Sequence, residues 1–147
     1  MIMIKEQYRA DYRGYGILVI GHTAGYRCGY VGIPEYHPFF GVYYNTIDRV
    51  TSYNLNVHGG LTYSGEDVHD KDPDFDWWIG FDCSHIGDAK DPMLVGSQMF
   101  MDSYQRIVPP GIRQQIWTMD MVIAECKRLI DELHYYVDWV MPEGEEN

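Results

Sequence analysis

Cysteine and long apolar runs are both scarce in this sequence. The chain of 147 residues has three cysteines, Cys28, Cys83 and Cys126, and none of them is close to another. No apolar run approaches the roughly 20 residues that a membrane-spanning helix needs, and the first residues, MIMIKEQYRADY, are too polar for a secretory signal peptide. These features argue against a membrane protein and a disulfide-built secreted domain, so we expect a cytoplasmic protein.

Positive charge is also in short supply. The formal net charge is −11, which argues against sequence-independent binding to DNA or RNA because that binding needs a basic surface. Residues 66–91 hold nine acidic residues against two lysines, a local charge of −7. The acidic stretch 66–76 is typical of a solvated loop. A second interpretation is an acidic decoy that covers the nucleic-acid-binding surface of another protein.

Several strong site signatures are missing. The sequence contains no GxGxxG, P-loop, CxxC or HExxH motif, and it has no internal repeat. Its 46% apolar and 22% charged residues are those of an ordinary globular protein. We therefore expect one domain over residues 1–141, followed by an acidic tail at 142–147 that is predicted to be disordered.

The hydrophobic pattern predicts a small, mostly antiparallel sheet and one long C-terminal helix, which is an α+β fold. Strands are expected over 3–9, 15–22, 26–33 and 77–82, with shorter pieces at 55–59 and 61–64 and at most one helical turn or irregular structure over 46–53. A helix is expected over 119–136 because Thr118 is a good N-cap and apolar residues follow at helical spacing. This helix should lie with its apolar stripe on one face of the sheet.

Three glycine-bearing segments carry the residues that could perform chemistry: 25–41, 56–65 and 81–88. Glycine lets the backbone turn sharply or approach a ligand closely, so polar residues beside it tend to face a cleft. In the strand 77–82, alternation places Asp82 on the face opposite Phe81. We expect His58 and His85 to converge beside Asp82 in one site.

The first interpretation of this site is a ligand pocket. Tyrosine and tryptophan side chains could form an aromatic wall for a nucleotide-like ring, and a few polar groups would orient it. The predicted ligand-binding residues are Arg27, His58, Gly59, Gly60, Trp78, Asp82, His85 and Asp88.

The second interpretation is a divalent metal site for zinc or manganese, in a small metal-dependent hydrolase. Histidine and aspartate are ligands that these ions accept, and the candidate set is His58, Asp82, His85 and Asp88. The competing interpretation is that these side chains only make hydrogen bonds that tie loops together.

The third interpretation is a nucleophilic cysteine at Cys83, activated by a neighbouring histidine. Strand alternation places Cys83 on the same face as Phe81, however, so inert packing is the favoured prediction for this thiol. The same holds for Cys28, and Cys126 falls on the apolar stripe of the predicted helix.

The blocks RCGYVGIPEYHPFFG, VHGGLTYSG and WWIGFDCSHIGD resemble, in this order, a group of small proteins encoded by bacteriophages and prophages. Those proteins end in a helix similar to MVIAECKRLIDEL, and the resemblance spans roughly residues 25 to 133. It implies no catalytic role. It implies a phage-borne accessory protein that acts in the bacterial cytoplasm, where many such proteins counter host defence.

The expected function is therefore capture of a small nucleotide-like ligand or a host protein by a phage-type accessory factor. The metal-dependent hydrolase and the acidic decoy stay as alternatives. Neither direct nucleic-acid binding nor membrane association is expected, and the sequence leaves open whether the chain forms a homodimer.

Overall fold

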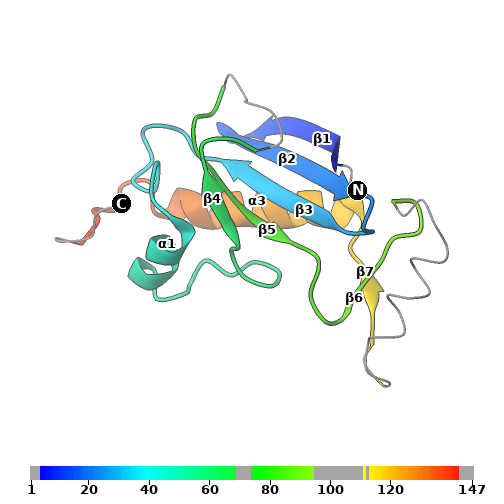
Figure 1. The fold of residues 1–147 in the computed structure, drawn as a ribbon. Coiled ribbons are helices and arrows are strands. Elements are labelled where there is room, and N and C mark those ends of the chain that lie inside the picture. The colour runs from blue at the N-terminus through cyan, green and yellow to red at the C-terminus, as the bar shows by residue number, and fades with distance from the viewer. Residues whose placement is uncertain (1–3, 69–73, 95–110, 112, 143–147) are drawn as a thin grey trace.

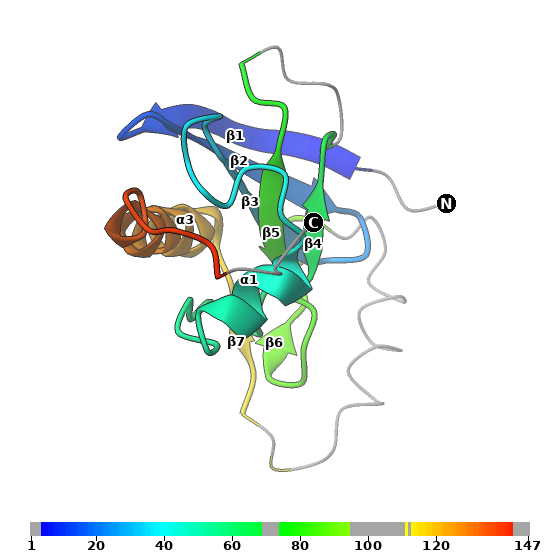
Figure 2. The ribbon, with the colours of Figure 1, turned by 90° about the vertical axis from the view of Figure 1, so that its left-hand side faces the viewer.

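The computed structural model describes residues 4–68, 74–94, 111 and 113–142. Its centre is a five-stranded antiparallel sheet with the strand order β1-β2-β3-β5-β4 (Figure 1). The strands are β1 (Ile4–Tyr12), β2 (Tyr15–His22), β3 (Arg27–Gly32), β4 (Tyr63–Gly65) and β5 (Trp78–Asp82). The 17-residue helix α3 (Met119–Tyr135) packs on one face of this sheet (Figure 2). The predicted α+β class is confirmed.

Two tight turns connect the first three strands. The turn between β1 and β2 contains Arg13 and Gly14, whose φ angles of 55° and 85° are those of a two-residue hairpin loop. In the turn between β2 and β3, the amide of His22 donates to the carbonyl of Tyr26, and Gly25 donates back to His22. The strands predicted over 15–22 and 26–33 are confirmed as β2 and β3, which pair as a hairpin. The pairing of β1 with β2 was not predicted.

The two faces of the sheet bury different apolar clusters. Trp77, Ile79 and Phe81 belong to the main core beneath α3, whereas Trp78 belongs to a smaller cluster with Leu18 on the other face. The alternation predicted for this strand is therefore confirmed. Because Asp82 follows the same alternation, it projects on the face away from the helix.

Local sequence explains where α3 begins and which side it buries. The Thr118 hydroxyl accepts a hydrogen bond from the amide of Met121, as expected of an N-cap, and Asp120 lies in the first turn. The buried positions recur every three or four residues and face the sheet: Val122, Cys126, Leu129, Ile130 and Leu133. The helix predicted over 119–136 is confirmed.

Replacing Leu129 with alanine is expected to lower the free energy of unfolding by about 2–5 kcal/mol. The side chain is completely buried in the main core, so its loss leaves a cavity between helix and sheet. Lys127→Ala is the matched control, because Lys127 is exposed on the same helix. Its ammonium lies 5.5 Å from the centroid of the Tyr12 ring, so its loss should cost at most about 1 kcal/mol. Urea unfolding measures both, and equal effects would contradict the packing of α3.

The connection between β3 and β4 differs in part from expectation. The helix α1 (Tyr44–Val50) extends over seven residues, longer than the single turn expected. The predicted strand at 55–59 is wrong, because this segment is a loop that ends at Gly59 and Gly60, both with positive φ. Its alternation arises because Leu55 and Val57 point into the core while their neighbours do not. Only the second half of the piece predicted at 61–64 enters a strand, β4.

A second, two-stranded sheet lies near the end of the main sheet at which β5 ends (Figure 1). In it, β6 (Asp88–Ala89) pairs in parallel with β7 (Gln115–Ile116). This pairing places residues 113–117 beside the segment that leaves β5. Residues 69–73 of the predicted acidic loop and 143–147 of the predicted tail lie outside the described residues.

One buried histidine makes stability depend on pH. Nε2 of His37 is 2.7 Å from the carbonyl oxygen of Leu133, near the end of α3, and Nδ1 accepts from the amide of Phe39 at 3.0 Å. The ring is therefore neutral, with its proton on Nε2. Burial lowers the pKa of His37, although the hydrogen bond to Leu133 opposes this. Burial also lowers the pKa of His22.

We expect the free energy of unfolding to fall as the pH drops below the ordinary histidine pKa of 6.5. In this range the unfolded chain binds a proton that the folded chain does not, so acid favours unfolding. Urea unfolding between about pH 8 and about pH 5 should give a flatter pH dependence for His37→Gln than for the natural chain. His22 accounts for part of the slope that remains. Identical slopes would contradict this account.

Candidate functional site

Two histidine–carboxylate pairs lie where β5 leads into β6. Nε2 of His58 is 2.8 Å from Oδ1 and 2.9 Å from Oδ2 of Asp88. Nε2 of His85 is 3.1 Å from Oδ1 of Asp82. The centroids of the two imidazole rings are 5.9 Å apart in an edge-to-face arrangement. The structure therefore brings together the four residues that the glycine-flanked segments had suggested.

Asp88 is the fixed point of this arrangement. Its side chain is only 4% exposed, and Oδ2 accepts a hydrogen bond from the amide of His85 at 3.0 Å. The amide of Asp88 donates in turn to the carbonyl of His85 at 2.9 Å, which closes the turn between them. A buried carboxylate needs such donors, so Asp88 sets both the fold of this turn and the orientation of the His58 ring.

Gly59 allows the two histidines to come close. A Cβ atom at this position would lie 2.1 Å from Nε2 of His85, and the φ angle of 71° also favours glycine. Nε2 of His85 is buried, and its contact with Asp82 has an ion-pair distance without the geometry of a hydrogen bond. Oδ1 of Asp82 also accepts from the amide of Ser84 at 3.1 Å.

The helix α3 holds His58 from the other side. The amide of His58 donates to Oε2 of Glu125 at 2.7 Å, and Nε of Arg128 donates to Oε1 of the same carboxylate at 2.7 Å. Burial would raise the pKa of Glu125, but the hydrogen bonds from Arg128 and from the His58 amide outweigh it and lower this pKa. The His58 ring also lies against the Trp117 indole, with centroids 3.9 Å apart.

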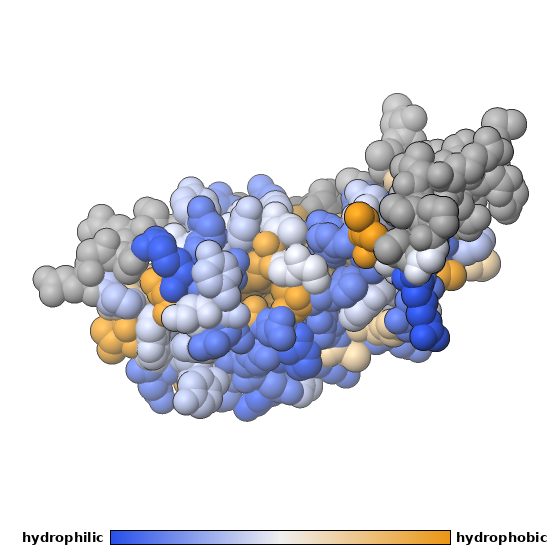
Figure 3. Space-filling model, turned by 90° about the horizontal axis from the view of Figure 1, so that it is seen from below, coloured by the Kyte–Doolittle hydropathy of each residue, from blue (hydrophilic) through white to orange (hydrophobic). Residues whose placement is uncertain are grey.

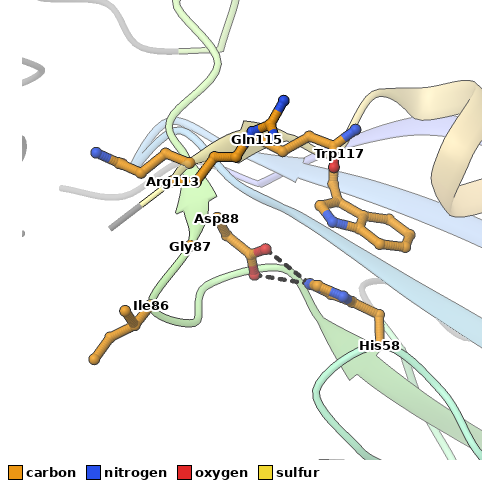
Figure 4. A pocket seen from close by; sticks show the side chains of 8 residues that line it. His58, Ile86, Gly87, Asp88, Arg113, Gln115 and Trp117 are labelled. Atoms are coloured by element: carbon orange, nitrogen blue, oxygen red, sulfur yellow. Dashed lines mark hydrogen bonds and ion pairs between the residues drawn. The ribbon is translucent and has the colours of Figure 1, made fainter. Parts of the chain in front are cut away.

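A cleft of about 630 Å³ opens beside the first pair, and we call it the His58 cleft. In Figure 4, Asp88 reaches from β6 toward His58, Trp117 lies beside the His58 ring, and Arg113 and Ile86 lie on the other side of Asp88. The lining residues are His58, Ile86, Gly87, Asp88, Arg113, Gln114, Gln115 and Trp117.

The second pair borders a different hollow of about 500 Å³, which we call the aromatic cleft. Asp82, Ser84 and His85 form its polar end. The segment 82–88 thus separates the two clefts. The other lining residues are His22, Tyr26, Cys28, Tyr30, Thr62, Tyr63 and Phe81.

Three of the predicted ligand-binding residues, Arg27, Trp78 and Gly60, line neither of the two clefts. Arg27 is buried and forms an ion pair with Asp91 at 2.8 Å, so its guanidinium is already engaged. Trp78 is buried in the smaller apolar cluster and lines neither of the two clefts. Gly60 has a φ angle of 84° with open space around it, so it serves the turn.

The predicted metal site is not supported by the geometry. Among the described residues, no group of three or more histidine, cysteine, aspartate or glutamate side chains is placed to hold a metal ion. The physical reason lies in the pairing. Both oxygens of Asp88 face Nε2 of His58, and Nε2 of His85 is packed against Gly59.

The cysteines are buried thiols. Cys83 is 2% exposed in the main core, and burial raises its pKa, so a reactive thiolate is not favoured. Burial raises the pKa of Cys28 to about 12 and also raises that of Cys126. The packing prediction for Cys83 and for Cys126 is confirmed.

Of the residues that line the His58 cleft, only His58 and Asp88 were predicted from the sequence. Arg113, Gln114, Gln115 and Trp117 come from a stretch without a clear hydrophobic period, and the short strand β7 places them beside β6. The one available signal was the polar run RQQ ahead of an isolated tryptophan and a helix N-cap. Glu125 was also missed, because it lies on the expected solvent side of the helix.

Comparisons with protein-family models, with curated proteins and with solved structures find no match to the chain. No helix among the described residues is long and apolar enough to cross a membrane. The site therefore has to be interpreted from its own chemistry.

Proposed function

We propose that the protein binds a small phosphate-bearing ring compound of the nucleotide class in the His58 cleft. The observation that carries this proposal is the combination, in one cleft of about 630 Å³, of an arginine, two glutamine amides and a histidine that is held between a carboxylate and an indole. Ligand pockets of this class typically measure about 300–1,000 Å³.

The phosphate would be held by Arg113. Its side chain is exposed at the cleft, and it makes no ion pair with any residue in the described part of the chain. A guanidinium presents paired donors that match phosphate oxygens. The net charge of −11 repels anions in general. An arginine at a cleft with no acidic partner among the described residues therefore favours an anion at that one position.

The ring would be positioned by the wall of the cleft. His58 cannot turn freely, because Asp88 fixes its Nε2 and Trp117 packs on its face. A rigid wall of this kind lowers the entropy lost when a flat ring is bound. The amides of Gln114 and Gln115 add donors and acceptors that could read the edge of a base or a sugar.

Phage origin and a role in counter-defence are part of the same proposal. The resemblance of the three sequence blocks to phage-encoded proteins supports a role in capturing a host nucleotide signal in the bacterial cytoplasm. A host protein is the less favoured partner. The face in Figure 3 is mostly hydrophilic, and hydrophobic residues show there only in small areas among the described residues, unlike a typical large apolar interface.

Arg113→Gln is expected to weaken nucleotide binding by about 10- to 100-fold, because a hydrogen bond to a charged group contributes about 1.5–3 kcal/mol. Isothermal titration of the purified protein with AMP and ATP measures this. Lys127→Gln is the matched control, since it removes one positive charge from the exposed face of α3 and should leave affinity unchanged.

Two further results bear on the proposal. A compound absorbing in the ultraviolet that co-purifies with the natural chain but not with Arg113→Gln would support it. Failure of the natural chain to bind any mononucleotide at millimolar concentration would contradict it, as would equal losses in the two variants.

A further inference from the structure

The aromatic cleft lies on the sheet face away from α3. Gly29 faces the helix, because a Cβ there would lie 2.9 Å from Sγ of Cys126. The flanking residues of β3, Cys28 and Tyr30, therefore point to the other face, where Tyr30 packs on the smaller apolar cluster. This cleft and the His58 cleft share no lining residue.

Gly80 makes room for one of the rings that line the cleft. It is the cross-strand partner of Tyr30, and a Cβ at this position would lie 2.4 Å from the Tyr30 ring. The Tyr30 ring therefore takes the space over Gly80. The tyrosine can therefore lie across β5 and present an aromatic surface at the cleft.

Two aromatic pairs line the cleft. The His22 and Tyr26 rings are stacked, with centroids 4.5 Å apart and planes inclined by 17°. The Tyr30 and Tyr63 rings meet edge to face at 5.5 Å. Such surfaces bind a flat ring by stacking on its face. Stacking depends little on which atoms the ring contains, because every aromatic ring presents a π-face. Specificity must then come from the polar end.

At the polar end of the aromatic cleft, the Asp82 carboxylate has one oxygen that can accept a further hydrogen bond. Oδ1 of Asp82 faces the Ser84 amide and Nε2 of His85. No contact of Oδ2 with another described residue is seen, and the side chain is 29% exposed. A carboxylate oxygen in such a position accepts a hydrogen bond from an N–H group of a ligand.

The charges around the cleft argue against a phosphate here. No arginine or lysine is among its lining residues within the described chain. One cation lies beside the cleft without lining it: Lys90 is buried, with its ammonium 4.8 Å from the centroid of the Tyr26 ring. A neutral ligand with N–H donors fits these surroundings better than an anion.

We propose that the aromatic cleft is a second binding site, which takes a planar heterocycle bearing an exocyclic amino group and needs no phosphate. The ring would stack on the tyrosines, and the amino group would donate to Asp82. The site is separate from the proposed phosphate-binding site, so either proposal can fail without the other.

The test uses two nucleosides that differ in one group. Adenosine carries the exocyclic amino group, and purine riboside has the same ring system without it. We expect the natural chain to bind adenosine about tenfold more tightly or better in a calorimetric titration. Asp82→Asn keeps the shape of the side chain and should remove this preference, whereas Arg113→Gln should not change it.

Nuclear magnetic resonance locates the bound nucleoside and does not depend on the variants. Adenosine should shift the ring signals of His22 and His85 and leave the indole N–H signal of Trp117 in place. The proposal is overturned if neither nucleoside binds at millimolar concentration, if both bind equally, or if the shifts fall on Trp117 instead. Binding of AMP that depends on Arg113 would still be possible in each of these cases.

Discussion

Replacing Arg27 with methionine is expected to lower the free energy of unfolding by about 3–5 kcal/mol, because it leaves a buried charge without a partner. The Arg27 side chain is 8% exposed, and its guanidinium lies 2.8 Å from Oδ2 of Asp91, which is nearly as buried. It also donates to Oε1 of Gln7 at 2.8 Å and to the carbonyl of Trp117 at 3.0 Å. The substitution therefore removes a hydrogen-bond donor from Asp91, Gln7 and the Trp117 carbonyl together.

The control for this prediction is an ion pair on the surface. Arg9 and Glu6 lie 2.6 Å apart with both side chains more than a third exposed, and a pair of this kind contributes about 0–1 kcal/mol. Arg9→Met should therefore change little in urea unfolding. In the double variant Arg27→Met with Asp91→Leu, much of the lost stability should return. Equal costs for the two single variants would contradict the buried pair.

Arg27 also connects the fold to the His58 cleft. It lies at the start of β3, holds the loop after β6 through Asp91, and holds the chain after β7 through the carbonyl of Trp117. The Trp117 ring in turn packs on His58. A residue that the sequence suggested as a ligand group is therefore a positioning residue, and its loss should also weaken binding in that cleft.

Local patterns predicted much of the fold. Alternation is a property of the strand itself, so the opposite faces of Ile79 and Trp78 could be read directly. The start of α3 could be read from Thr118 because a cap acts within one turn. The same reasoning gave a wrong strand at 55–59. Leu55 and Val57 are buried and their neighbours are not, which is the pattern of a strand, but the segment is a loop.

Long-range geometry limited what could be predicted about the site. The two histidines were expected to meet in one site because both lie in glycine-bearing segments. Their rings do lie 5.9 Å apart, but His58 and His85 line separate clefts instead of one shared site. The pairing of Arg27 with Asp91 joins residues 64 positions apart, and nothing in the sequence links them. The neighbours Arg113 and Trp117 reach His58 only through β7, a strand of two residues that is too short for any periodic signal.

Gly59→Ala is expected to lower both stability and binding, and its neighbour Gly60→Ala is the matched control. Both glycines have a positive φ, of 71° and 84°, so alanine costs about 1–2 kcal/mol of backbone strain at either position. Around Gly60 no atom lies within 4 Å of an added Cβ, so this variant measures the strain alone.

At Gly59 the added methyl group has no room. Its Cβ would lie 2.1 Å from Nε2 and 2.4 Å from Cδ2 of His85, so the imidazole must move away from the loop. Overpacking of this kind adds about 1–3 kcal/mol to the strain. Urea unfolding should therefore place Gly59→Ala below Gly60→Ala by about that amount.

The displaced ring also tests how the two clefts are coupled. His85 is edge to face with His58 and lies 3.1 Å from Asp82, so its movement alters one polar group at each cleft. We expect Gly59→Ala to weaken binding of both AMP and adenosine in titrations of the folded protein, while Gly60→Ala keeps both affinities. If Gly59→Ala melts earlier but binds both compounds normally, His85 only ties the loop at 58–60 to the turn after β5 and takes no part in either site.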